Sequence, residues 1–178
     1  MSDTAANGSR LPNMLIIGIG NPDRSDDGVG LAVARALAAK NLPNTTVVEA
    51  RGDGATLGEV WKREDHVIIV DAMCSGAPPG AIRRFDAHEV QVPLDRFRCS
   101  SHTFGVGEAI ELARSLNRLP AHMILVGIEG KNFDVGLGIS RQVVIAARQV
   151  VAEIAREIRS AQPRRSRART RSSAPVSV

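Results

Sequence analysis

The pattern of apolar and polar residues along the chain predicts strands that alternate with helices. Short continuous apolar runs, bounded by glycine, proline or charged residues, are typical of buried strands. The runs lie at about Met14–Ile19, Thr45–Glu49, His66–Asp71, Ala81–Phe85 and Met123–Ile128. The connection before the fourth run, MCSGAPPG, is short. We expect antiparallel pairing there, because a parallel crossover needs about a dozen residues or more.

Apolar residues at helical spacing predict three longer helices and one short helix. The predicted buried stripes are Val29, Val33, Ala36 and Leu37 in a helix over about 27–39; Val106, Ala109, Ile110, Ala113 and Leu116 in a helix capped by Thr103 or a neighbour; and Val143, Ala147, Val150, Val151, Ile154 and Ile158 in a helix over about 141–160. The short helix is expected near Leu57–Lys62. This alternation predicts an α/β fold, a three-layer α/β/α sandwich whose mostly parallel, twisted sheet has about five strands and carries helices on both faces.

Composition supports a single domain with an aliphatic core. The chain has 178 residues, only 3% of them aromatic, and no tyrosine. Valine, isoleucine, leucine and alanine must therefore fill the core, which suits a buried parallel sheet. We expect one α/β domain over residues 13–162, with a polar disordered segment before it (1–12) and a disordered basic tail after it (163–178).

The net charge belongs mostly to the tail. Five arginines lie in 163–178, and removing them takes the formal net charge from +4 to −1. A basic tail can bind nucleic acid, but a solvated end is the favoured interpretation, so we expect no nucleic-acid partner. No apolar run reaches the roughly 20 residues that span a bilayer, and no signal segment opens the chain, so a cytoplasmic protein without a membrane partner is expected. Cys74 and Cys99 show no CxxC spacing, and no disulfide is expected.

The stretch MLIIGIGNPDRSDDGVG, from Met14 to Gly30, predicts a strand, a tight loop and a helix start that carries two carboxylates. Gly18 and Gly20 form GxG, but the third glycine of a dinucleotide fingerprint would fall on Asp23. No lysine followed by serine or threonine completes a phosphate loop either, and the acids would repel a pyrophosphate. No nucleotide cofactor is therefore expected. The carboxylates point instead to a cation, a general base or a helix cap.

Three residues are candidates for chemistry: Asp27 after the first strand, Asp71 at the end of the third, and His102 at a helix start. Because the carboxyl ends of parallel strands share one edge of the sheet, these side chains can meet despite their separation along the chain. Two carboxylates and an imidazole suit a borderline metal such as nickel or zinc.

Each candidate also has a purely structural interpretation. Asp26 and Asp27 could cap the first helix, Asp71 could bind a loop amide, and His102 could be a surface or cap residue. The neighbouring sequence CSSH is no evidence of a Cys–His pair, and GxSxG is absent, so covalent catalysis is disfavoured. The other histidines, His66, His88 and His122, are expected to be structural.

From about Leu15 to Ile158 the chain resembles the nickel-dependent hydrogenase maturation endopeptidases. GIGNPDRSDDGVG resembles the opening motif of that family, and IIVDA resembles its third-strand motif. SSHTFG resembles its S-x-H-x-x-G segment, and LVGIEG with GLGIS resembles its late strand and the start of its last helix. The four motifs occur in the order and spacing of the family.

The resemblance implies a hydrolase, an aspartic-type endopeptidase that removes a C-terminal extension from the large subunit of a nickel-iron hydrogenase after nickel insertion. It places the metal-contacting residues at Asp27, where some members have Glu, at Asp71 and at His102. The nickel would come with the nickel-loaded precursor, so a metal-free resting enzyme is expected. The family often has an Asp-Gly-Gly-Thr-like turn after its second strand; this chain has RGDGAT there, so the resemblance assigns no role to Asp53.

The resemblance does not assign a nucleophile or a base. The catalytic candidates are Asp27, Asp71 and His102, and a metal-activated water, a metal-polarised carbonyl and a carboxylate base all remain open. Two alternative functions also remain: a non-catalytic nickel-sensing or chaperone-like module that binds the large subunit, and a small-molecule hydrolase.

Overall fold

A five-stranded sheet in the order β2-β1-β3-β5-β4 forms the centre of the molecule. The computed structural model describes residues 13–51, 57–63, 65–97 and 105–161. The strands are β1 (Met14–Ile19), β2 (Thr45–Ala50), β3 (His66–Met73), β4 (Ile82–Asp86) and β5 (His122–Glu129). β2, β1, β3 and β5 run parallel, and β4 pairs antiparallel with β5. The predicted sheet, including its one antiparallel strand, is confirmed.

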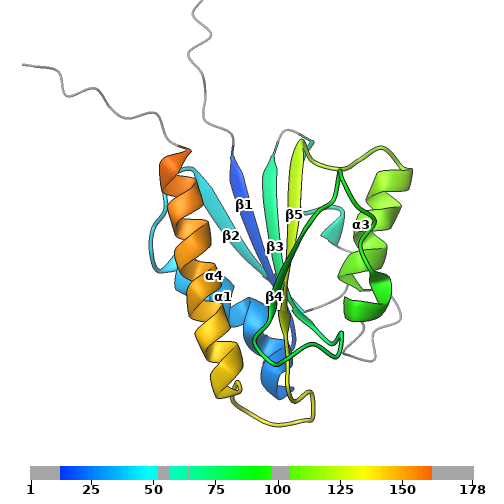
Figure 1. Ribbon diagram of the computed structural model, residues 1–178. Helices are drawn as coiled ribbons and strands as arrows, with labels where there is room; N and C mark the ends of the chain where they lie inside the picture. The colour runs from blue at the N-terminus through cyan, green and yellow to red at the C-terminus, as the bar shows by residue number, and fades with distance from the viewer. Residues whose placement is uncertain (1–12, 52–56, 64, 98–104, 162–178) are drawn as a thin grey trace, which may run out of the picture.

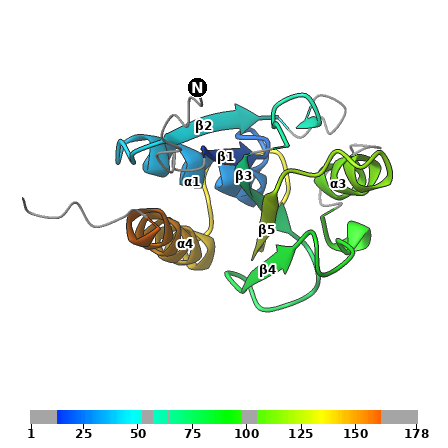
Figure 2. The same cartoon turned by 90° about the horizontal axis from the view of Figure 1, so that it is seen from above.

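Helices cover both faces of this sheet. α1 (Val29–Ala38) and α4 (Arg141–Ser160) lie on one side, and α3 (Val106–Ser115) lies on the other (Figure 2). Alternate residues of a strand point to opposite faces. Leu15, Ile17 and Ile19 of β1 therefore join the cluster under α3, while Ile16 joins the cluster under α1 and α4. The predicted three-layer sandwich is confirmed.

The structure agrees with the predicted bounds of the last helix, but two of the predicted buried residues are exposed. α4 begins and ends where the sequence placed it. α3 begins at Val106, and its N-cap is Gly105, whose amide donates to the Glu108 carboxylate at 3.2 Å. Thr103 itself lies outside the described residues. Leu116 is 56% exposed because α3 has ended before it, and Ala36 is exposed while Ala34 takes its place in the core.

Two further bounds differ from the sequence prediction near the edge where the site is expected. The first helix is preceded by a short 3₁₀ helix, η1 (Ser25–Gly28), so both aspartates of the DDG sequence lie before α1. β3 continues two residues past Asp71 to Met73, so Asp71 is not the last residue of its strand. Of the short helix predicted near residues 57–62, the described residues show only Leu57 in helical conformation, followed by a turn.

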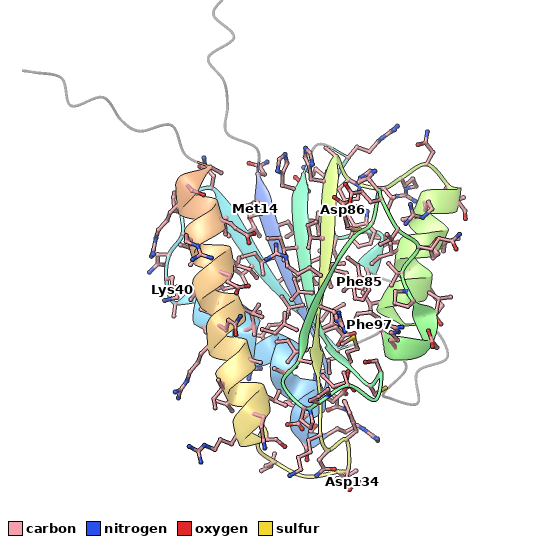
Figure 3. All side chains as sticks on the ribbon, in the orientation of Figure 1. Met14, Lys40, Phe85, Asp86, Phe97 and Asp134 are labelled. Carbon is pink, nitrogen blue, oxygen red and sulfur yellow. The ribbon has the colours of Figure 1, made fainter. Side chains whose placement is uncertain are left out.

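The parallel topology gathers the carboxyl ends of β1, β3 and β5 at one edge of the sheet (Figure 1). Met14, which begins β1, lies at the opposite edge from Asp134, which lies in the loop between β5 and α4 (Figure 3). The loops that could form a site all leave from this carboxyl edge. None of the helices in the described part of the chain combines the length and apolar character that crossing a bilayer requires.

Candidate active site

The turn from β1 into α1 is built so that Asp27 comes close to β3. Gly20 has φ +148°, and a side chain there would collide with the carbonyl of Asp27. Gly30 packs against the carbonyls of Ile19 and Val70, so it too has no room for a side chain. Gly20 and Gly30 thus allow close packing of the helix start against β1 and β3. Because Val70 immediately precedes Asp71, this packing sets the two aspartates side by side.

Asp27 and Asp71 form a buried carboxyl pair. Their exposed fractions are 6% and 7%. Burial and, after it, the negative charge of Asp27 together raise the pKa of Asp71 to about 8, although the Ala72 amide, which donates to Asp71 Oδ1 at 2.8 Å, acts in the opposite direction. At neutral pH Asp71 therefore holds a proton in the free protein. A cation placed between the two groups would displace that proton, because it favours the charged carboxylate.

The structure describes two of the three predicted site residues. Asp27 and Asp71, 44 positions apart in the sequence, are brought together as predicted. His102, together with Asp53 and Cys99, lies outside the described residues. Within the described ranges no group of three or more His, Cys, Asp or Glu side chains is arranged to hold a metal ion. The proposed ligand set of Asp27, Asp71 and His102 therefore stays a prediction.

Asp26 does not cap the first helix, as one interpretation of the sequence had it. Its carboxylate accepts hydrogen bonds from the amides of Lys131 (2.8 Å), Asn132 (2.9 Å) and Ser140 (2.6 Å), all in the loop between β5 and α4. The side chain is fully buried. Burial alone would raise the pKa of Asp26, but the amide hydrogen bonds outweigh it and lower the pKa below its usual value. Asp26 thus joins η1 to a loop more than 100 residues away.

Glu129 plays a similar part in the next loop and was missed by the sequence analysis. It is 2% exposed and ends β5, opposite Met73 of β3. Its carboxylate accepts hydrogen bonds from the Ser75 amide (2.8 Å) and hydroxyl (2.8 Å) and from the Gly76 amide (2.9 Å). Glu129 therefore shapes the loop that follows Asp71. No local pattern could have identified it, because its partners lie more than 50 residues away.

The loop between Gly20 and η1 is joined to the loop after β5 by a second set of contacts. The Ser25 amide donates to the Gly136 carbonyl at 2.9 Å, and the Gly136 amide donates to the Asp23 carbonyl at 3.0 Å. Ser25 has φ +49°, a left-handed conformation that costs a non-glycine residue about 1 kcal/mol or more. These hydrogen bonds hold the strained residue two positions before Asp27.

The remaining histidines have structural surroundings away from this edge. The rings of His66 and His122, at the amino ends of β3 and β5, lie with centroids 4.2 Å apart. Burial lowers the pKa of His66, and His122 lowers it further. His88 Nε2 lies 2.9 Å from the Pro120 carbonyl. Their predicted structural role agrees with this placement.

Cys74 corrects a prediction. It follows β3 directly, its amide donates to the Arg96 carbonyl at 2.9 Å, and it is disulfide-bonded, although no disulfide was expected. The spacing of cysteines along the chain does not report which loops meet in space, and that is why the sequence pattern failed here. The other cysteine in the sequence, Cys99, lies outside the described residues.

Comparison with known proteins identifies the family. The hydrogenase maturation protease family matches residues 31–157. The hydrogenase expression/formation protein HupD of Thiocapsa roseopersicina is 30% identical over 125 residues, which cover 69% of this chain and 57% of that protein. The matched region thus spans little more than half the length of that relative.

Solved structures share the fold. The NiFe hydrogenase maturation protease HybD from Thermococcus kodakarensis is 27% identical with a TM-score of 0.62, over 82% of this chain and 98% of that one. The hydrogenase maturating endopeptidase HybD from E. coli has a TM-score of 0.69 over 83% of this chain and 93% of that one, and at 23% identity it supports the fold alone. Since the family match covers more than half of its residues, this chain belongs to the hydrogenase maturation protease family.

Proposed function

We propose that this chain is an endopeptidase that removes the C-terminal extension of the large subunit of a nickel-iron hydrogenase after nickel has been inserted. The observation that carries the proposal is the buried pair of Asp27 and Asp71, in which the charge of one raises the pKa of the other. Such a pair is poorly stabilised without a cation. A nickel ion already held by the precursor would supply that cation.

In this proposal the nickel is part of the substrate, and it is bound by Asp27, Asp71 and His102. Contact with the ion would hold the scissile peptide bond beside the carboxyl pair. Hydrolysis would then proceed as an effectively unimolecular reaction within the complex. Asp27 is suited to this role because Gly20 and Gly30 let the η1 turn approach β3 closely. The loops fixed by Asp26 and Glu129 would form the adjoining walls.

The hydrolysis requires a water oxygen to bond to the carbonyl carbon, the peptide C–N bond to break, and a proton to reach the leaving amine. A carboxylate at this site can take the proton from the attacking water, and a protonated carboxyl can give one to the amine. Asp71 would lose its proton on contact with the nickel, so the carboxyl group that takes the proton from the attacking water would be the one that returns it to the amine.

Incubation with nickel-loaded precursor, followed by mass spectrometry, tests this function. We expect a shorter large subunit and a released peptide, and we expect Asp27→Asn to abolish both, because it removes the charge and keeps the side-chain volume. Thermal melts should show that this variant folds like the wild type. Nickel-dependent binding without any shortened subunit would instead support the non-catalytic binding module, and rapid cleavage by Asp27→Asn would remove the carboxyl pair from the reaction.

A further inference from the structure

The loop between β5 and α4, which is hydrogen-bonded to the turn that precedes Asp27, exposes two large apolar side chains. Val135 and Leu137 are 82% and 87% exposed, and the other exposed large apolar side chains of the described residues are at most 57% exposed. They flank Gly136, which bridges to Arg24. In Figure 3 the neighbouring residue Asp134 lies at the outer tip of the carboxyl edge. An apolar pair this exposed gains free energy when a partner covers it.

This loop is held rigidly in place. Besides the three amides that bind the Asp26 carboxylate, the Asp26 amide donates to the Asn132 carbonyl at 3.0 Å and the Ser25 hydroxyl donates to the Asp134 carbonyl at 3.2 Å. The apolar side chains are thus presented on a preformed support rather than on a free loop. A partner that covers them does not have to order the loop first, which favours binding.

Arg24 adds a polar donor to the same surface. Its guanidinium forms no hydrogen bond or ion pair with the described residues, and its Nε is buried without an acceptor. Buried donors of folded proteins are normally satisfied, so this one marks an incomplete contact. Because Nε does not touch solvent in the free protein, an incoming carbonyl oxygen would reach the terminal nitrogens or turn the side chain.

We propose that Val135, Leu137 and Arg24 form the docking surface for the precursor segment that adjoins the scissile bond, an inference that rests on the proposed function. Continuity with the site supports this occupant, since the same turn carries Arg24 and Asp27: the Asp27 amide donates to the Arg24 carbonyl at 3.0 Å. A second copy of the chain fits less well, because two side chains provide far less than the roughly 800 Å² per partner of a stable interface.

The apolar side chains define the chemistry of that segment. The exposed charges beside the loop are of both signs, with Asp23 and Asp134 against Lys131 and Arg141, so they select no net charge. The segment should therefore carry apolar side chains for Val135 and Leu137 and a backbone carbonyl for Arg24.

The test measures KM and kcat for cleavage of nickel-loaded precursor by V135S/L137S, with L112S/L116S as the matched control. Leu112 and Leu116 are 50% and 56% exposed on α3 and its end, on the other face of the sheet. We expect V135S/L137S to raise KM about tenfold with kcat within about twofold of wild type, because the lost contacts position the substrate and do not enter the chemistry. R24Q should raise KM several-fold, and its control is R159Q, at an exposed position in the last turn of α4.

A precursor with aspartates in place of the apolar residues beside the cleavage position completes the test. Wild type should discriminate strongly against it, and V135S/L137S should discriminate less, since coupled sites are not additive. An unchanged KM for V135S/L137S, while wild type cleaves, would overturn the docking surface and leave the proposed function standing. An unchanged KM for R24Q would remove Arg24 from it. Wild type that neither binds nor cleaves the precursor would overturn the proposed function, and this inference with it.

Discussion

At the scale of single residues, the adjacent aspartates of η1 have separate tasks. Successive residues of a 3₁₀ helix point about 120° apart, so the two carboxylates cannot face the same surroundings. Asp27 lies beside Asp71, where its charge raises the pKa of that group. Asp26 faces the other way and binds three amides of the loop after β5. The carboxyl pair is thus kept in place by a neighbour that takes no part in it.

Replacement of Asp26 should destabilise the fold more than loss of a helix cap would. Asp26→Ala leaves three amide groups without their acceptor in a buried setting, and each such loss costs about 1–3 kcal/mol. We expect the free energy of unfolding to fall by at least ~2 kcal/mol, measured by urea denaturation, with the exposed Asp23→Ala as the control. A loss no larger than that of Asp23→Ala would show that the loop is held by its backbone contacts alone.

Asp71 should make the stability of the free protein depend on pH in an identifiable way. An unfolded aspartate loses its proton near pH 3.8, whereas folded Asp71 keeps its proton up to a pH of about 8. Between these values the native state binds more protons than the unfolded state, so stability falls as pH rises. Asp71→Asn cannot lose a proton. Its melting temperature relative to wild type should therefore rise from about pH 5 to about pH 8, and parallel curves would contradict the raised pKa.

At the scale of elements, the local sequence patterns predicted the strands and helices better than they predicted the contacts around the site. β1 and α4 have the predicted bounds because a continuous apolar run and a 3.6-residue stripe report burial directly. Such patterns could place Asp27 and Asp71 at one edge through the parallel topology. They carry no information on which loop receives the Asp26 or Glu129 carboxylate, since those contacts join residues more than 50 positions apart. The extension of β3 past Asp71 was missed because Ala-Met-Cys reads equally well as strand or loop.

The loop after β3 offers a test at this scale. Glu129→Gln keeps the shape of the side chain but replaces one acceptor oxygen with a donor group facing the Ser75 and Gly76 donors. We expect about 1–3 kcal/mol of lost stability and slower precursor cleavage, since the loop adjoins Asp71. Glu89→Gln, at an exposed position, is the control. Full cleavage activity in a measurably destabilised Glu129→Gln would show that this loop supports the fold and not the site.

At the scale of the whole molecule, the sheet and its glycine contacts fix the carboxyl pair before any partner arrives. The packing of Gly30 on Val70 forces the two aspartates together, although burial and mutual charge make that arrangement unfavourable for two ionised groups. A fold that maintains such a pair is prepared for a cation. The disulfide at Cys74 and the hydrogen bonds of Glu129 restrain the same edge from the side of β3.

If the carboxyl pair binds the nickel of the precursor, then precursor without nickel should not be cut. Its peptide segment could still reach Val135 and Leu137, but nothing would draw the scissile bond toward Asp27 and Asp71. We expect mass spectrometry to show the shortened large subunit only with nickel-loaded precursor, after circular dichroism has shown that both precursors are folded. Weak binding of the nickel-free form that the V135S/L137S variant abolishes would separate docking from metal recognition. Equal cleavage of both precursors would mean that the carboxyl pair acts on the peptide without binding the nickel.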